Sequence, residues 1–110
     1  MATNQNAGLE FIDGLARQLA YEMYLEGRWR ETETLLKGVL SSNPTDAWSL
    51  SVYASMLRKQ GKFKEAIVVL ETAHSLDPAD ENITRMHHEM DAFVTAMQQR
   101  QPVQQPRPVD

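Results

Sequence analysis

Hydrophobic side chains recur along this chain with the spacing of amphipathic α-helices. Between residues 13 and 26 the small and apolar side chains fall on one helical face, and they are Leu15, Ala16, Leu19, Ala20 and Met23. Residues 29–42, 48–60 and 63–76 show the same periodicity, and residues 81–99 carry it a fifth time. The pattern therefore predicts five amphipathic helices and an all-α fold, with the apolar stripe of each helix facing the core.

Glycine and proline divide these helices into pairs. Gly27 and Gly61 each interrupt the periodicity, and glycine readily adopts the positive φ found just past a helix end. Pro44 and Pro78 stop the second helix of each pair, because proline has no N–H for the helix ladder and restricts the residue before it. The chain thus reads as two helix hairpins followed by one more helix. The expected N-caps after the prolines are Thr45 and Asp80.

The two hairpins repeat each other with a shift of 34 residues. The matched pairs are Ala20 with Ala54, Gly27 with Gly61, Trp29 with Phe63, Leu36 with Leu70, Val39 with Ala73, and Pro44 with Pro78. A period of this length is typical of stacked helix hairpins. We expect the aromatic residue after each glycine to fill the turn. We expect paired helices to approach most closely at the small residues Ala20, Ala54, Ala66 and Ala73.

The second repeat, Ala47–Asp80, resembles a tetratricopeptide repeat. It carries the small residues, turn glycine, aromatic residue and final proline of that family at Ala54, Gly61, Phe63, Ala66, Ala73 and Pro78. Leu50 stands where the family has tryptophan. The first repeat, residues 13–46, is a poorer copy, since Thr32 replaces an alanine and Ala16 replaces a large residue.

The resemblance implies a short α-solenoid of two hairpins and a capping helix. Residues 81–99 begin like a third repeat, but His88 holds the small-residue position and no turn glycine follows. We therefore expect a single C-terminal helix that covers the open face of the second hairpin. On this interpretation residues 9–99 form the domain, residues 1–8 a flexible N-terminus, and residues 100–110 a disordered tail rich in glutamine and proline.

The composition excludes several classes of function. The 110 residues include no cysteine, which rules out disulfides, thiol catalysis and cysteine-ligated zinc. The formal net charge of −4 and the lack of any run of Lys or Arg argue against a nucleic-acid partner. No stretch reaches the ~20 apolar residues of a membrane helix, and the N-terminus lacks an apolar leader. We therefore expect no membrane association and a cytoplasmic location.

No motif indicates catalysis, and we expect neither an enzyme nor a cofactor. The serines lack the strand–turn–helix context of a nucleophile elbow, and there is no glycine-rich phosphate loop. His87 and His88 are adjacent, so they point about 100° apart on a helix and do not chelate one ion as an i, i+4 pair does. We interpret these two residues and His74 as structural or solvent-facing histidines and expect no metal site.

The tetratricopeptide resemblance also implies a concave groove lined by the first helix of each repeat and by the terminal helix. The predicted partner-binding residues are Arg17, Tyr21, Tyr24, Leu25, Trp48, Val52, Ser55, Lys59, Met86 and Phe93, with Gln18, Ser51, Arg58 and Arg85 beside them. Aromatic residues, Arg and Met are enriched at recognition interfaces, and this set suits a helix or extended peptide of another protein. An alternative for Tyr24 and Leu25 is packing beneath the N-terminal segment or the tail.

Small, acidic tetratricopeptide proteins resemble the cytosolic chaperones of type III secretion systems. Such a chaperone buries an apolar segment of a secreted or assembling subunit and prevents its premature assembly. The alternative is a co-chaperone or scaffold adaptor that captures a peptide C-terminus. Arg17 fits that mode, but Tyr21 stands where the mode needs asparagine.

The small number of repeats bears on assembly. Repeat arrays ordinarily need about three repeats for stability, because each unit buries its apolar face only against its neighbours. Two hairpins and one helix should therefore have a small stability margin. We expect the chain to self-associate as a homodimer or to be held by a partner in a heterodimer.

Overall fold

Five α-helices make up the part of the chain that the structure describes. A computed structural model gives the backbone of residues 3–100 and the side chains of residues 11–100. The helices are α1 (Thr3–Leu25), α2 (Trp29–Ser42), α3 (Ala47–Lys59), α4 (Phe63–Leu76) and α5 (Glu81–Arg100). No strand occurs between residues 3 and 100, so the predicted all-α fold is confirmed.

The ends of the domain differ in part from the prediction. α1 begins at Thr3, so residues 3–8, which were predicted to be a flexible N-terminus, are helical. α5 matches the predicted capping helix and ends at Arg100. The rest of the predicted tail lies outside the described residues. Between residues 3 and 100, no helix combines the length and the apolar character needed to cross a bilayer.

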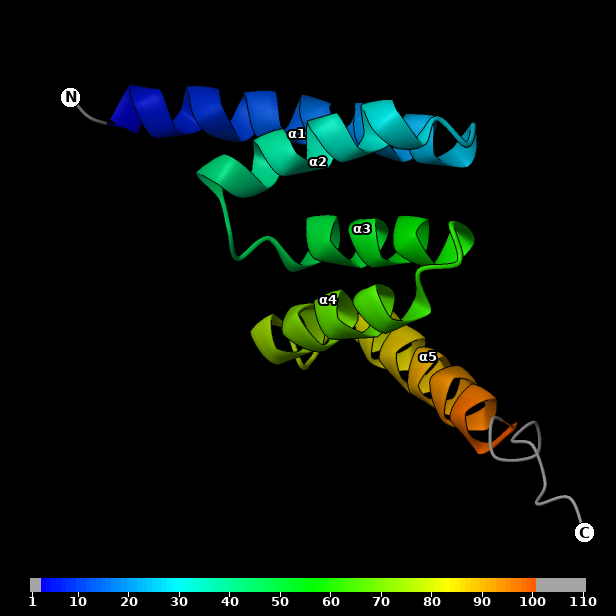
Figure 1. Ribbon diagram of the computed structural model, residues 1–110. Helices are drawn as coiled ribbons and strands as arrows, with labels where there is room; N and C mark the ends of the chain where they lie inside the picture. The colour runs from blue at the N-terminus through cyan, green and yellow to red at the C-terminus, as the bar shows by residue number, and fades with distance from the viewer. Residues whose placement is uncertain (1–2, 101–110) are drawn as a thin grey trace, which may run out of the picture.

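The helices are arranged as two hairpins and a closing helix (Figure 1). α1 packs on α2, α3 packs on α4, and α5 packs on α4. α3 also contacts both α1 and α2, so the second hairpin nests against the first. The contacts within each hairpin are more extensive than those between the hairpins. α1 therefore lies at one end of the stack and α5 at the other (Figure 1).

Both hairpins turn in the same way. Gly27 and Gly61 have φ angles of 76° and 81°, in the left-handed region that favours glycine. In each turn the N–H after the glycine donates to the carbonyl oxygen five residues earlier, as in a Schellman motif. These bonds run from Arg28 N–H to the Met23 oxygen (2.9 Å) and from Lys62 N–H to the Leu57 oxygen (2.8 Å). The sequence repeat is therefore also a repeat of backbone geometry.

Aspartates hold the N-cap positions after the two prolines. The Ile83 N–H donates to Asp80 Oδ1 (2.9 Å), which confirms the predicted cap of α5. The predicted cap at Thr45 is wrong, because Asp46 holds the N-cap position of α3. The Thr45 hydroxyl donates instead to Asn43 Oδ1 (3.1 Å). The Asp46 side chain makes no capping bond, since it accepts bonds from other side chains, described below.

The four alanines that were predicted to lie between paired helices are buried. Their side chains are at most 1% exposed, and they are Ala20, Ala54, Ala66 and Ala73. The larger core lies between α3, α4 and α5 and also contains Leu57, Leu70, Ile83 and Met90. The smaller core joins the two hairpins through Ala20, Leu36 and Val52.

Thr32 shows how the poorer first repeat tolerates its departure from the pattern. It holds the place of Ala66 in the second repeat and is completely buried. Its hydroxyl donates to the Arg28 carbonyl oxygen one turn earlier (2.8 Å). The polar group is thus satisfied within its own helix, and burial costs little.

α1 buries only one edge of the apolar face that its sequence pattern predicts. Ala20 packs against α2 and α3, but Leu15 and Leu19 are 53% and 44% exposed. Phe11 and Ile12 are also exposed on this side. The prediction that Leu15 and Leu19 face the core is wrong, because the neighbouring helices pack on the alanine side of α1. Alanine permits the closer approach there.

α5 packs mainly through its first half. Ile83 and Met90 are buried, whereas Met97 is 41% exposed. α5 has 20 residues and α4 has 14. At 1.5 Å per residue they are about 30 Å and 21 Å long, so the last turns of α5 extend past α4. His88, in the register of Ala20 and Ala54, is exposed, because no helix of residues 3–100 packs on that side.

Replacing a turn glycine by alanine should destabilise the protein, whereas the same change inside a helix should stabilise it. Gly61→Ala places a Cβ on a backbone with φ 81°, which costs about 1–2 kcal/mol even though nothing lies within 4 Å of that Cβ. Gly38→Ala, within α2 and equally free of neighbours, should raise the free energy of unfolding by about 0.5–1 kcal/mol. Urea denaturation followed by circular dichroism at one protein concentration measures both. Equal stability of the two variants would contradict this account of the turn.

Candidate functional site

A groove runs across α1, α3 and α5, and we call it the α1–α3–α5 groove. It consists of three adjoining open cavities of about 520, 350 and 430 Å³. The first and second cavities share Tyr21 and Trp48, and the second and third share Tyr24 and Ser55. Because its three helices come from three successive units of the stack, the groove spans both hairpins and the closing helix.

Every predicted partner-binding residue except Leu25 lines this groove. Those that line it are Arg17, Tyr21, Tyr24, Trp48, Val52, Ser55, Lys59, Met86 and Phe93. Leu25, the last residue of α1, is 65% exposed and lines none of the three cavities. Val52 is only 6% exposed, so it contributes to the core as well as to the floor of the groove.

Aromatic rings form a row along the α1 side of the groove. The ring centroids of Trp48 and Tyr21 lie 6.2 Å apart, and those of Tyr21 and Tyr24 lie 6.0 Å apart. The ring centroid of Tyr24 in turn lies 6.0 Å from that of Trp29, the first residue of α2. Tyr21 and Trp48 remain 45% and 39% exposed. Each ring is thus held by its neighbours and still offers apolar surface to a ligand.

The end of the groove near the C-terminus of α3 is positively charged. Arg58 and Lys59 lie in the last turn of α3, and neither pairs with a carboxylate among the described side chains. Lys59 Nζ lies 5.7 Å from the centre of the Tyr24 ring, a cation–π distance. Burial raises the pKa of the Tyr24 phenol, while a hydrogen bond with Ser55 partly offsets that rise. The phenol therefore stays neutral, and the charge at this end comes from the two cations.

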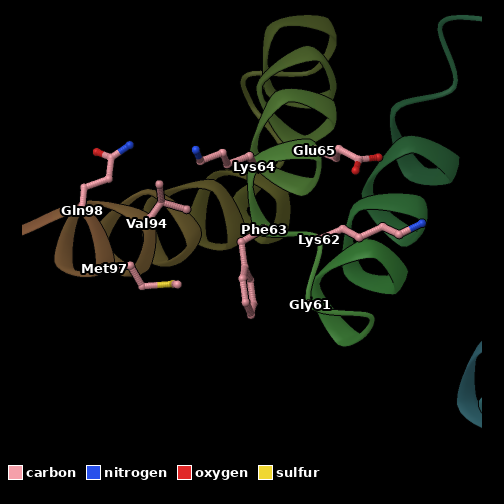
Figure 2. Close-up of a pocket in the computed structure, with 8 residues that line it drawn as sticks. All are labelled: Gly61, Lys62, Phe63, Lys64, Glu65, Val94, Met97 and Gln98. Carbon is pink, nitrogen blue, oxygen red and sulfur yellow. The ribbon is translucent and has the colours of Figure 1, made fainter. Parts of the chain in front are cut away.

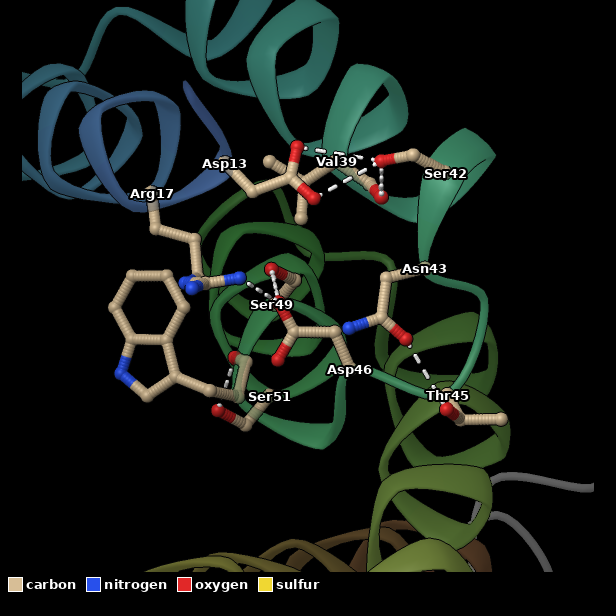
Figure 3. Close-up of polar contacts among 10 residues, drawn as sticks. Asp13, Arg17, Val39, Ser42, Asn43, Thr45, Asp46, Ser49 and Ser51 are labelled. Atoms are coloured by element: carbon tan, nitrogen blue, oxygen red, sulfur yellow. Dashed lines mark hydrogen bonds and ion pairs between the residues drawn. The ribbon is translucent and has the colours of Figure 1, made fainter. Parts of the chain in front are cut away.

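Asp46 joins the two hairpins near the other end of the groove (Figure 3). Arg17 Nη1 lies 3.0 Å from Asp46 Oδ2, and the Ser49 hydroxyl donates to the same oxygen (2.7 Å). The Asp46 side chain is 12% exposed and Ser49 is fully buried. Arg17 was predicted to bind a partner, and although it lines the groove, its charge is used to hold α1 against the start of α3.

A further cavity, of about 320 Å³, lies between the start of α4 and the second half of α5 (Figure 2). Phe63, Val94 and Met97 supply its apolar lining. Phe63 also lines the groove, where its ring centroid lies 4.9 Å from that of Phe93. This cavity was not predicted from the sequence. Val94 and Met97 have helical spacing in the sequence, but only the structure shows that they extend past the start of α4 at Phe63.

The histidines make a contact between helices. The rings of His74 in α4 and His87 in α5 stack with centroids 5.1 Å apart and planes 11° apart. His88 points elsewhere and is exposed. Within the described part of the chain, no three or more His, Asp or Glu side chains gather where they could hold a metal ion.

Comparison of the chain with protein-family models found no match, and comparison with curated proteins found none either. The groove and its side chains are therefore the features that bear on function.

Removing Arg17 should lower stability more than removing an exposed cation. Arg17→Ala leaves the Asp46 carboxylate nearly buried with Ser49 as its remaining side-chain donor, and should cost about 1–2 kcal/mol. Lys37→Ala removes an exposed partner of Glu33 and should cost less than about 0.5 kcal/mol. Chemical denaturation of both variants measures the difference. If Arg17→Ala unfolds at the same denaturant concentration as Lys37→Ala, Arg17 has no role in holding the hairpins together.

Proposed function

We propose that this protein binds a helix or an extended segment of another protein in the α1–α3–α5 groove and shields that segment from aggregation or premature assembly. The observation that supports the proposal best is the row of partly exposed aromatic rings, Tyr21 and Trp48 above all. Large aromatic side chains in a concave surface are the usual anchors of protein recognition. Here they are fixed on helices, so little conformational entropy is lost when a ligand binds.

The lining of the groove indicates the chemistry of the ligand. Three cavities in series accept apolar side chains at intervals along one segment. Arg58 and Lys59 at one end favour an acidic residue at the corresponding end of that segment. The lining mixes polar and apolar surface, and in this proposal the aromatic anchors supply most of the binding energy, so the affinity should depend only weakly on salt.

The 34-residue period and the matching turns support a tetratricopeptide-type module. On that basis we extend the proposal to a cytoplasmic chaperone of the kind that type III secretion systems use. Its client would be a subunit that polymerises or inserts elsewhere, and its mechanism would be occlusion of the client's apolar segment. The chaperone needs no catalytic group for this.

Capture of a peptide C-terminal carboxylate has less support. Arg17 holds one of the positions whose cation that mode uses, but it already pairs with Asp46. Tyr21 offers a phenol in place of an amide, and the Ser51 hydroxyl donates to the Trp48 carbonyl oxygen (2.7 Å). The groove therefore lacks the polar pattern that would distinguish a carboxylate from other groups.

Alanine substitution of the aromatic anchors should weaken the complex by at least about tenfold. The partner is first isolated with tagged protein from the native cell, and its bound segment is mapped by limited proteolysis and mass spectrometry. The synthetic segment is then titrated by calorimetry against wild type, Tyr21→Ala and Trp48→Ala. Each anchor should contribute about 1.4–3 kcal/mol to binding. Unchanged affinity in folded variants would place the binding site outside the groove.

Two controls sharpen this experiment. Val68, 61% exposed on α4 and not among the groove residues, should tolerate Val68→Ala with less than about a twofold change in the dissociation constant. Raising sodium chloride from 0.1 to 1 M should leave the dissociation constant within about threefold, because exposed charges contribute little. A much steeper salt dependence would favour carboxylate capture over the apolar mode.

A further inference from the structure

A second apolar surface, beside the groove and meeting it at Gln18 and Glu22, lies on the outer side of α1. Phe11, Ile12, Leu15 and Leu19 are 68%, 61%, 53% and 44% exposed. They share one face of the helix, and we call them the α1 stripe. Ala20, which follows Leu19 and points about 100° away from it around the helix, packs on α2 and α3. Because α1 is the end of the stack, no helix of residues 3–100 covers the stripe (Figure 1).

We propose that the α1 stripe is the interface of a homodimer, in which the α1 helices of two copies pack antiparallel across a twofold axis near Leu15. A twofold interface uses the same surface on both copies, so a single apolar face is sufficient to form it. With the axis near Leu15, the stripe of one copy lies against the stripe of the other over its whole length. The aromatic anchors of the groove lie on a different side of α1 and stay exposed, whereas Gln18 and Glu22 border both surfaces.

Charge favours the antiparallel orientation. Glu22 and Glu26 continue the helix face of the stripe toward the C-terminus of α1, and both are exposed. In a parallel pair each glutamate would lie against the same glutamate of the other chain, and the like charges would repel. An antiparallel pair places them beside the first turns of the partner's α1, where the helix dipole is positive and the first turn contains no acidic residue.

A second copy fits this surface better than a head-to-tail stack does. In such a stack the α1 stripe of one molecule would lie on α5 of the next. The position on α5 that corresponds to Ala20 and Ala54 is occupied by His88, whose ring prevents a close approach. The twofold arrangement avoids α5 and also closes after two copies.

The size of the stripe sets the expected affinity. At roughly 200 Å² for a large apolar side chain, the exposed fractions of the four residues amount to roughly 450 Å² per copy. A standard interface buries about 800 Å² per partner, so flanking residues such as Gln18 and Met23 must supply the rest. We expect a moderate dimer, with a dissociation constant in the micromolar range.

The absence of cysteine allows a direct test of the geometry. Any introduced thiol is the only one in the chain. Under copper–phenanthroline oxidation, Leu15→Cys should form a disulfide-linked dimer, because residue 15 lies near the twofold axis. Glu26→Cys should not, because the two copies of residue 26 lie at opposite ends of the helix pair. Linking through both positions would overturn the antiparallel arrangement, and linking through neither would overturn the interface.

Sedimentation equilibrium provides the second measurement. Wild type at 100 μM should have twice the 12.5 kDa mass of one chain, and Leu15→Glu should have the mass of one chain. Val68→Glu, a matched charge on another exposed site, should remain dimeric. Circular dichroism checks that each variant is helical. If Leu15→Glu fails to fold, the cysteine pair still decides the question.

Two further results would overturn the proposal, and one further variant tests whether the dimer is independent of the groove. A wild-type monomer at 100 μM would overturn it, as would a mass that grows beyond two copies with concentration. A variant with Tyr21→Ala and Trp48→Ala should remain dimeric, because neither residue belongs to the stripe. The dimer and the groove can therefore fail separately.

Discussion

The close approach of helices at alanine is the constraint on which the whole structure depends. Ala20, Ala54, Ala66 and Ala73 are at most 1% exposed and belong to the buried clusters between the helices, so a larger side chain at any of them would push the helices apart. In a stack that buries apolar surface only between neighbours, a wider spacing would lose contacts at every interface. The turn geometry, the core and the groove all depend on this spacing between the helices.

The fold was largely predictable because it is written as local, repeated signals. Each signal acts over a few residues. The spacing of apolar residues specifies the helices, the glycines at positions 27 and 61 specify the turns, and the alanines specify the contacts between helices. The errors arose where a neighbouring element decides. Leu15 and Leu19 belong to an apolar face, but which face of α1 is covered depends on where α2 and α3 lie. Thr45 is a reasonable cap, yet Asp46 holds the position.

The groove was predicted through the family resemblance and less completely from the residues alone. The register of the repeats placed Tyr21, Trp48 and Lys59 on one surface, and the structure brings them together. What the register does not show is which side chains are already engaged. Arg17 pairs with Asp46 across 29 positions of sequence, a contact that exists only after the hairpins nest. Likewise, Met97 is exposed because two helices have unequal lengths.

The way the groove crosses the stack links recognition to rigidity. α1, α3 and α5 belong to three successive units of the stack. The interface between the two hairpins is less extensive than the contacts within each hairpin. It is formed by Val52, the Arg17–Asp46 pair and a hydrogen bond from Tyr53 to Glu33 (3.1 Å). A bound segment that contacts all three helices would bridge the interface between the two hairpins. It would thereby fix the angle between the hairpins and stabilise the whole stack.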